Sequence, residues 1–196
     1  MSVNIKDIVT IDVSEEDINQ AKEIRQERDN IFGNIYPESE TDQRWSGDLG
    51  EIIVNKLFCM CRPLSTDWHL EDVAGKPDFT FCGVTLDIKT VKRKVPMRTS
   101  YGAQITAKHI ATPMDYIVFT CFEYPVNKLH VLGAIKKKDF IKQARYYGSG
   151  EKVHEYYTIR NGHEIYSIEI SKLIPFRQFV RMCLLQEQKN TENIAA

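Results

Sequence analysis

The 196-residue sequence lacks an excess of charge of either sign, because 26 Lys and Arg residues stand against 27 Asp and Glu residues. A protein that binds nucleic acid through a broad basic surface is strongly basic, so this balance argues against such a partner. Hydrophobic residues make up 42% of the chain and charged residues 27%, which is ordinary for a globular domain. A chain of this length buries a core of its own without disulfides or metal.

Long apolar runs are absent as well. No run approaches the roughly 18 residues that a membrane-spanning helix requires. Residues 1–12 contain no basic segment followed by an apolar stretch, so the sequence predicts no secretory signal. Together these absences predict an intracellular, cytoplasmic protein with no membrane partner.

Paired cysteine motifs are also missing. The five cysteines form no CxxC pair, which favours reduced thiols that behave as small buried hydrophobes. Cys59 and Cys61 form a CxC, but a zinc or iron–sulfur centre needs a second set of ligands. A cysteine-based metal centre is therefore the weaker interpretation.

The sequence does contain an alternation of helical and strand patterns. Ser14 and the acidic residues after it predict a helix that runs to about Asp29, with alternating charges typical of a solvated outer face. An apolar stripe at helical spacing predicts a second helix over 44–59. β-rich runs follow at 79–81, 84–91, 115–122 and 128–135. This order predicts a mixed α/β domain around a central sheet.

Turn and cap residues divide the chain further. Residues 33–39 predict a loop, and Asn161-Gly162 between two β-rich runs predicts a hairpin. Ser171 is the expected N-cap of a last helix that ends near Gln186. The expected organisation is an N-terminal helical extension (1–43), an α/β domain (44–186) and a frayed C-terminal tail (187–196).

One stretch has a pattern typical of catalysis, in which Pro77-Asp78 is followed by Asp87-Ile88-Lys89. Because strand side chains alternate between faces, Asp87 and Lys89 are expected on one face and Ile88 on the other. A turn at Cys82-Gly83 would pair the two strands and bring Asp78 near Asp87. Two carboxylates and an ammonium group would then converge.

Such a group suits metal-assisted hydrolysis of a phosphodiester. Two carboxylates with water form a hard oxygen site for Mg²⁺ or Mn²⁺, to which the Ile88 carbonyl is a further candidate ligand. Lys89 would orient or deprotonate the attacking water and offset charge on the phosphate. The alternative is structural: Asp87 and Lys89 form an ion pair on the strand face, and Asp78 caps a turn.

The second predicted helix offers a further acid. Asp48 and Glu51 are three residues apart and share a helix face, so one of them is a candidate to assist the metal directly or through water. The series Glu51, Pro77-Asp78 and Asp87-Ile88-Lys89 resembles the PD-(D/E)XK nuclease superfamily, over roughly residues 44–135.

This resemblance implies a restriction-endonuclease-like core, a central mixed β-sheet flanked by helices. It also implies that Asp78 and Asp87 bind Mg²⁺ or Mn²⁺, that Lys89 acts on the nucleophilic water and that Glu51 assists metal binding. Some relatives carry a Gln in the helix after the Lys strand, followed four residues later by Tyr. Gln104 is the candidate for that position, although residue 108 is Lys here.

Basic residues follow the motif and predict where nucleic acid binds. The first set begins beside Lys89 and consists of Lys92, Arg93, Lys94 and Arg98. A second cluster, over 136–145, precedes Tyr146 and Tyr147, which are able to stack on bases. A solvated charge run explains this second cluster equally well.

The sequence therefore predicts a Mg²⁺-dependent nuclease, and the resemblance favours DNA over RNA. A homodimer would supply a second active site for double-strand cleavage, although no sequence pattern identifies an interface. One rival is a catalytically silent protein of the same fold that binds nucleic acid or serves as a scaffold. The other is an unrelated α/β protein whose acids and lysine pair structurally.

Overall fold

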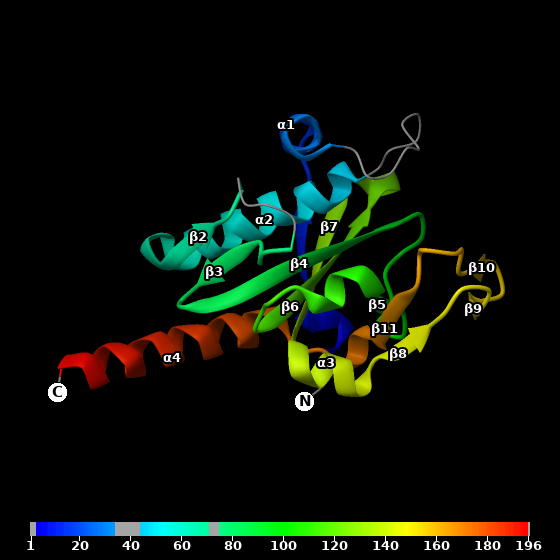
Figure 1. The fold of residues 1–196 in the computed structure, drawn as a ribbon. Helices are drawn as coiled ribbons and strands as arrows, with labels where there is room; N and C mark the ends of the chain where they lie inside the picture. Colours follow the sequence, from blue (N-terminus) through cyan, green and yellow to red (C-terminus); the bar gives the residue numbers. More distant parts are fainter. Residues whose placement is uncertain (1–2, 34–43, 71–74, 196) are drawn as a thin grey trace.

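The computed structural model describes residues 3–33, 44–70 and 75–195, and Figure 1 shows a curled sheet at its centre. Six strands form this sheet in the order β1-β7-β6-β4-β3-β2. Their bounds are β1 Val9–Asp12, β2 Thr66–Trp68, β3 Phe79–Phe81, β4 Val84–Arg93, β6 Tyr116–Glu123 and β7 Lys128–Lys136. Strands β4 and β6 run parallel, and the other neighbours are antiparallel. The predicted mixed α/β class with a central mixed sheet is confirmed.

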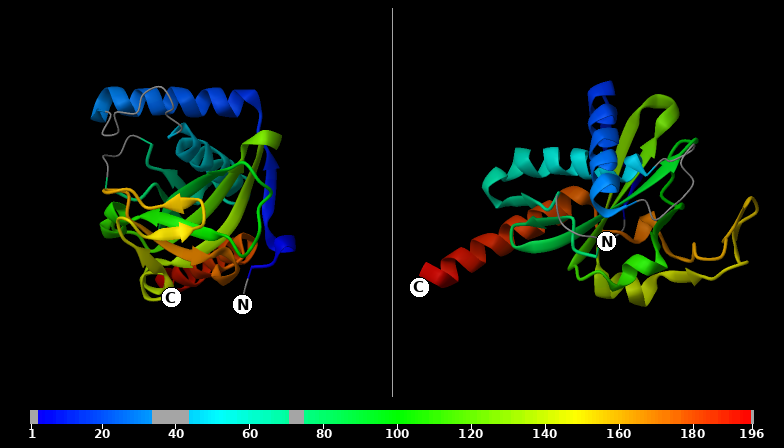
Figure 2. Two further views of the ribbon diagram at one scale, coloured as in Figure 1. Left: turned by 90° about the vertical axis from the view of Figure 1, so that its right-hand side faces the viewer. Right: turned by 45° about the horizontal axis from the view of Figure 1, so that its top comes forward.

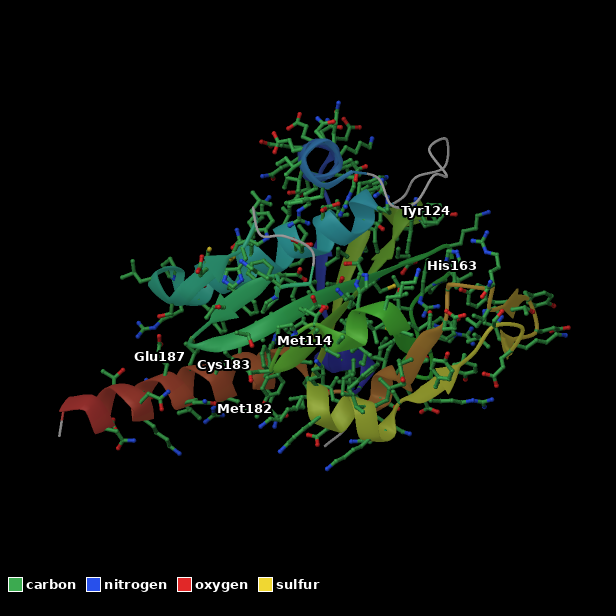
Figure 3. The ribbon with its side chains drawn as sticks, in the orientation of Figure 1. Met114, Tyr124, His163, Met182, Cys183 and Glu187 are labelled. Carbon is green, nitrogen blue, oxygen red and sulfur yellow. The ribbon has the colours of Figure 1, made fainter. Side chains whose placement is uncertain are left out.

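Helices cover the sheet. Their bounds are α1 Glu15–Phe32, α2 Trp45–Cys61, α3 Lys137–Gln143 and α4 Phe176–Ala195. Helix α2 packs on the sheet and α1 crosses over it on the outside, as Figure 2 shows from two sides. In Figure 3 helix α4 projects from the body, with Cys183 and Glu187 on the side of the sheet and Met182 on the opposite side. No helix in the described part of the chain is long and apolar enough to cross a membrane.

A smaller antiparallel sheet faces the side of the central sheet opposite α2. It consists of β5 Gly102–Thr106, β11 Ile165–Glu169 and β8 Arg145–Tyr147 in the order β5-β11-β8. Two separate apolar cores result, one between the central sheet and helices α1, α2 and α4, the other beneath the smaller sheet and α3. Both faces of the central sheet are thus buried, which explains the near-continuous apolar run of β6.

A tight turn joins β3 to β4, as the sequence predicts. Cys82 and Gly83 have φ angles of 50° and 76°, and Phe81 pairs directly with Val84. A two-residue hairpin loop with both φ angles positive is a type I′ turn, whose twist matches that of the flanking strands. The turn therefore sets the antiparallel register that the site depends on.

Helix α2 approaches the sheet unusually closely at Gly50. A Cβ atom at this position would lie 2.0 Å from Thr90 Oγ1 and 2.9 Å from Thr120 Oγ1. These two hydroxyls are themselves hydrogen-bonded at 2.8 Å, Thr120 donating to Thr90. The absence of a side chain at Gly50 thus places the next residue, Glu51, beside strand β4.

The structure differs from the sequence expectations at both ends of the chain. The segment 1–43, expected as a helical extension, contributes β1 to the central sheet through its pairing with β7. Helix α4 begins at Phe176, not after Ser171, which lies in the short 3-10 helix Ile170–Lys172. Pro175 precedes α4, as suits a helix start, and the helix continues to Ala195 through residues predicted to be frayed.

The predicted hairpin at Asn161-Gly162 is wrong. Gly162 does adopt a positive φ of 78°, so the turn itself is present. The strand before it, β10 Tyr157–Thr158, pairs with β9 Lys152–His154, whereas β11 pairs with β5 and β8. Strand β11 gains two neighbours and a buried face by this choice. Most of the loop predicted over 33–39 lies outside the described residues.

Candidate active site

A cleft of about 610 Å³ opens beside the point where β3 and β4 part. Strand β3 pairs with β4 only as far as Leu86, whereas β4 continues to Arg93 along β6. Residues from α1, α2, β4 and the segment 75–78 line this cleft, among them Arg28, Glu51, Asp78, Asp87 and Lys89. The parting of the strands thus brings the acids of the sequence pattern to one opening.

Strand register places Asp78 opposite Asp87. The last ladder pair is Phe79 with Leu86, so the next position on each strand holds one of the two acids. The Ile88 amide donates a hydrogen bond of 2.6 Å to Asp78 Oδ2. Beyond the last ladder pair, the Asp78 carboxylate therefore accepts the hydrogen bond that a backbone carbonyl of β3 would otherwise accept. This bond fixes the position of the carboxylate.

Lys89 and Asp87 lie on the same face of β4, as the alternation of strand side chains predicts. Lys89 Nζ is 2.5 Å from Asp87 Oδ2 in an ion pair. Asp87 is only 3% exposed, and this oxygen accepts no hydrogen bond of normal geometry. A buried carboxylate oxygen without a hydrogen bond is costly unless a cation neutralises it.

The charges of the site shift two pKa values upward. Burial and the negative charges of Glu51 and Asp87 raise the pKa of Asp78 well above its ordinary value. Burial alone would lower the pKa of Lys89, but Asp87 and Asp78 outweigh it and raise that pKa. Lys89 is therefore an ammonium group at neutral pH, which suits orienting a water molecule and offsetting phosphate charge rather than removing a proton.

His69 holds the segment that carries Asp78, a role that no pattern in the sequence indicates. Its backbone N–H donates to the Asp78 carbonyl at 2.9 Å, and its Nδ1 lies 3.0 Å from the Pro77 carbonyl oxygen. Thr80 Oγ1 contacts Nε2 at 3.2 Å. These contacts fix the backbone on both sides of the acid.

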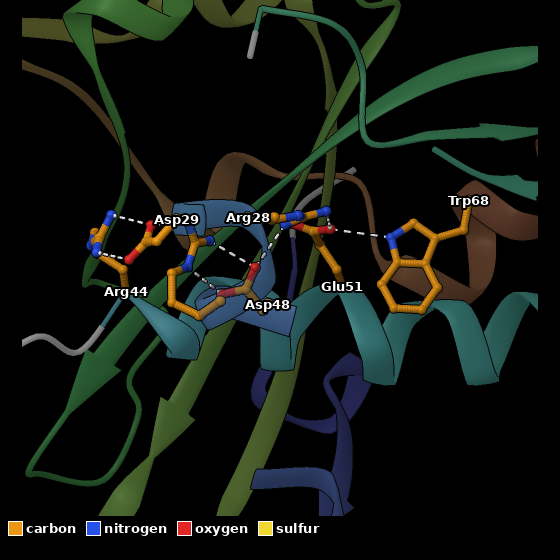
Figure 4. Close-up of polar contacts among 7 residues, drawn as sticks. Arg28, Asp29, Arg44, Asp48, Glu51 and Trp68 are labelled. Atoms are coloured by element: carbon orange, nitrogen blue, oxygen red, sulfur yellow. Dashed lines mark hydrogen bonds and ion pairs between the residues drawn. The ribbon is translucent and has the colours of Figure 1, made fainter. Parts of the chain in front are cut away.

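The acids of α2 have different partners (Figure 4). Asp48 is fully buried and accepts two hydrogen bonds of 2.7 Å from Arg25 and one of 2.7 Å from Arg28. Beside this network, Arg44 pairs with Asp29 through contacts of 3.0 and 2.5 Å. Burial raises the pKa of Asp48, and the charge of Arg25 opposes that shift. Arginine from α1 thus covers the polar side of α2.

Glu51 has both carboxylate oxygens occupied. Arg28 donates to Oε1 at 3.0 Å and to Oε2 at 2.8 Å, and Trp68 Nε1 donates to Oε2 at 3.1 Å. The Trp68 ring stacks on Phe79 of β3 with 5.8 Å between centroids. Burial opposes the charge on Arg28, but its hydrogen bonds and attraction to Glu51 raise its pKa overall.

The interpretation of α1 as a solvated outer helix is therefore wrong on one side. Ala21 and Ile24 pack toward α2, and Arg25 and Arg28 follow each of them by four residues, so they flank the same face. The alternating charges predicted a face exposed to solvent. Instead, these arginines bond to acids of α2 that are 20 to 23 residues away in the sequence, and Arg25 also lies 4.0 Å from Asp29 of its own helix.

The strand acids fit a hydrated divalent cation, and Glu51 does not fit as a direct ligand. No three His, Cys, Asp or Glu side chains converge as a preformed metal cage among the described residues. Mg²⁺, however, keeps several waters and is commonly bound by one or two carboxylates. Asp78 and Asp87, with the Ile88 carbonyl beside them, match that requirement, whereas the carboxylate of Glu51 is already bound by Arg28.

Two of the predicted nucleic-acid contacts are engaged within the chain. Lys92 lies over the rings of Trp45 and Tyr124, at 5.3 and 4.6 Å from their centroids. Arg93 donates to the Gly102 carbonyl at 3.0 Å and lies over the Tyr101 ring. Each contact holds the cation against an aromatic ring of the protein.

Of the remaining predicted contacts with nucleic acid, two are exposed and one lies in a strand outside the cleft. Lys94 and Arg98 are exposed. Gln104 lies in strand β5 opposite Ser167, not in a helix as the resemblance implied, and it does not line the cleft. The cleft instead contains Lys108 and His109 of the 3-10 helix Ala107–Ala111, which sequence analysis did not assign to the site.

None of the family models, curated proteins or solved structures compared with this chain matches it. The arrangement of acids and cations in the cleft therefore carries the functional argument. The buried cysteines offer no competing centre, because burial raises the pKa of Cys82 and Cys121 to about 11 and that of Cys183 to about 12.

Proposed function

We propose that this protein is a metal-dependent nuclease with a restriction-endonuclease-like core of the PD-(D/E)XK kind. The observation that carries the proposal is the position of Asp78 opposite Asp87, with Lys89 on the same strand face at the wall of the cleft. A silent fold has no physical need to keep two carboxylates beside a single ammonium group, since the carboxylates repel one another.

Each residue of the site has a distinct role in the proposed reaction. Asp78 and Asp87 would hold Mg²⁺ or Mn²⁺, which supplies polarisation of the phosphoryl oxygen and a more acidic water. Lys89, as an ammonium group, orients the attacking water and offsets the charge that develops on the phosphate. The Ile88 amide fixes the position of the Asp78 carboxylate.

The proposed substrate is DNA, favoured over RNA by the resemblance of the motif. Lys108 is exposed at the cleft and offers positive charge to a phosphate backbone. Such contacts release counterions, so binding should weaken steeply as salt concentration rises.

The test is cleavage of labelled single-stranded, duplex and branched DNA, and of RNA, with Mg²⁺ or Mn²⁺ and with chelator. Cleavage is expected with metal and is expected to disappear in chelator and in the Asp87→Asn and Lys89→Ala variants. Lys128→Ala is the matched control, because Lys128 is also a strand lysine near an aspartate, at 3.9 Å from Asp12, outside the cleft. Wild-type cleavage by either site variant would refute the proposal.

A catalytically silent nucleic-acid-binding module is the second candidate function. It is favoured by the bonding of Glu51 to Arg28. If the protein is such a module, it should bind DNA without cleaving it, and Asp87→Asn should leave that binding unchanged.

A further inference from the structure

Four carboxylates and three cationic side chains interact with one another between α1, α2 and β4. The carboxylates belong to Asp48, Glu51, Asp78 and Asp87, and the cations to Arg25, Arg28 and Lys89. The ionised set carries one net negative charge. One divalent cation would change this to one positive charge, which a single phosphodiester then balances. A second divalent cation would bring the set to three positive charges without the phosphodiester, or two with it, beside two arginines.

The positions of the cations agree with this balance. Arg28 already occupies the side of the cleft next to Glu51, where it binds both carboxylate oxygens. The same guanidinium also donates to Asp48, which is fully buried. Displacing Arg28 would remove a cationic partner from both Glu51 and Asp48. The contacts with these two acids therefore hold the guanidinium in place.

The Trp68 indole further reduces the capacity of Glu51 for metal. A carboxylate offers about four lone-pair sites. Arg28 and Trp68 use three of them through the hydrogen bonds described above. A metal at the remaining site would lie beside a guanidinium of like charge.

We infer that Arg28 acts as a fixed second cation of the site, so that the protein binds one divalent ion, at Asp78 and Asp87, and Glu51 is not a ligand. This inference rests on the proposed function, since it concerns the metal of the same site. It assigns Arg28 a positioning role: the guanidinium neutralises Glu51 and Asp48, and it confines the divalent ion to the strand acids.

The test counts Mn²⁺ ions bound to the full chain without nucleic acid, by the electron paramagnetic resonance signal of free Mn²⁺. The wild-type protein is expected to bind one ion per chain. Arg28→Gln, which releases Glu51, is expected to bind two. Arg25→Gln is the matched control, because Arg25 bonds to Asp48 but not to Glu51, and one ion per chain is expected.

A double variant keeps the inference testable if Arg28→Gln fails to fold. Arg28→Gln with Glu51→Gln removes a charge pair without changing the net charge. One Mn²⁺ with an affinity near the wild-type value is expected, whereas loss of a true ligand would weaken binding by more than about tenfold.

The outcomes separate the inference from the proposed function. Two ions bound to the wild-type chain, one ion bound to folded Arg28→Gln, or a large loss of affinity in the double variant would overturn the inference alone. No binding by the wild-type protein, or equal binding by wild type and Asp87→Asn, would overturn the proposed function and the inference with it.

Discussion

The helix acids and the strand acids of the cleft are of similar chemistry, yet they are neutralised very differently. Asp48 and Glu51 on α2 receive six hydrogen bonds from side chains, five of them from two arginines. Asp78 and Asp87 share one ammonium group, that of Lys89, which forms an ion pair with Asp87. The helix pair is saturated, whereas the strand pair is short of positive charge.

This difference indicates that the helix acids have a structural role and the strand acids a ligand-binding role. Saturated buried ion pairs hold elements in register, and they lose stability mainly when one partner is removed. An acid pair kept short of cations is unfavourable in the absence of a ligand and favourable once a cation binds.

The largest difference should appear when one strand acid is neutralised. Asp78→Asn is expected to lower DNA cleavage by about 10³-fold or more, because the metal would lose a carboxylate ligand. The stability of the Asp78→Asn variant, in contrast, should stay the same or increase. The raised pKa of Asp78 means that its ionised form opposes folding, so stability falls as pH rises above the ordinary carboxyl pKa.

Denaturant unfolding of this variant shows whether the substitution raises or lowers the free energy of unfolding. At pH 7.5 Asp78→Asn should be at least as stable as the wild type, and the difference should vanish near pH 3, where Asp78 is protonated in both states. A variant that loses stability at pH 7.5 would show that the strand pair, like the helix pair, is structural.

Removal of a helix-pair cation should instead act on stability. Arg25→Met takes two hydrogen bonds from Asp48, which has no exposure to water. We expect a loss of about 3 kcal/mol in the free energy of unfolding, as for other buried pairs that lose one partner. Urea unfolding measures it, and Arg181→Met, at an exposed position of α4, is the control. Equal effects of the two substitutions would contradict the structural role of the helix pair.

Gly50 allows α2, which carries the helix pair, to lie close to strand β4, which carries Asp87. Gly50→Ala places a methyl group against Thr90 and Thr120, and overpacking of this kind costs about 2 kcal/mol. Thr90→Ala removes the nearest atom, so the double variant should recover part of the lost stability. Additive losses in a double-mutant cycle would show that the close approach is not the cause.

The smallest effect should come from metal binding to the unmodified chain. Ca²⁺ in excess over its dissociation constant should raise the melting temperature by about 4 °C. Because protons compete with the cation for Asp78, whose pKa is raised, the increase should be larger at pH 8 than at pH 5. Thermal unfolding at both pH values checks this, with Asp78→Asn as control. An increase that persists in that variant would place the cation elsewhere.

Local rules explain which parts of the site were predictable. The period of two along a strand placed Asp87 and Lys89 on one face, and the turn at Cys82-Gly83 set Asp78 opposite Asp87. The cap at Ser14 likewise marked the start of α1. Each of these inferences depends on residues within a short stretch of chain.

Contacts between distant segments were not predictable in the same way. The arginines of α1 and their partners on α2 are separated by 20 or more residues, so no local pattern links Arg28 to Glu51. Strand β11 was predicted in a hairpin, but its burial against β5 and β8 overrode the turn signal of Gly162. The contacts of Lys92 with the rings of Trp45 and Tyr124 could not be predicted either, because these residues are also distant in the sequence.

The bond from the Ile88 amide to the Asp78 carboxylate makes the backbone of β4 a reporter of the state of the cleft. An acceptor that is a side chain is able to rotate toward another charge, which a backbone carbonyl in a ladder does not do. A ligand that draws Asp78 away would weaken the protection of this amide proton, whereas its neighbours along β6 stay paired. Hydrogen exchange at Ile88 would therefore give a label-free signal of occupancy from within the central sheet.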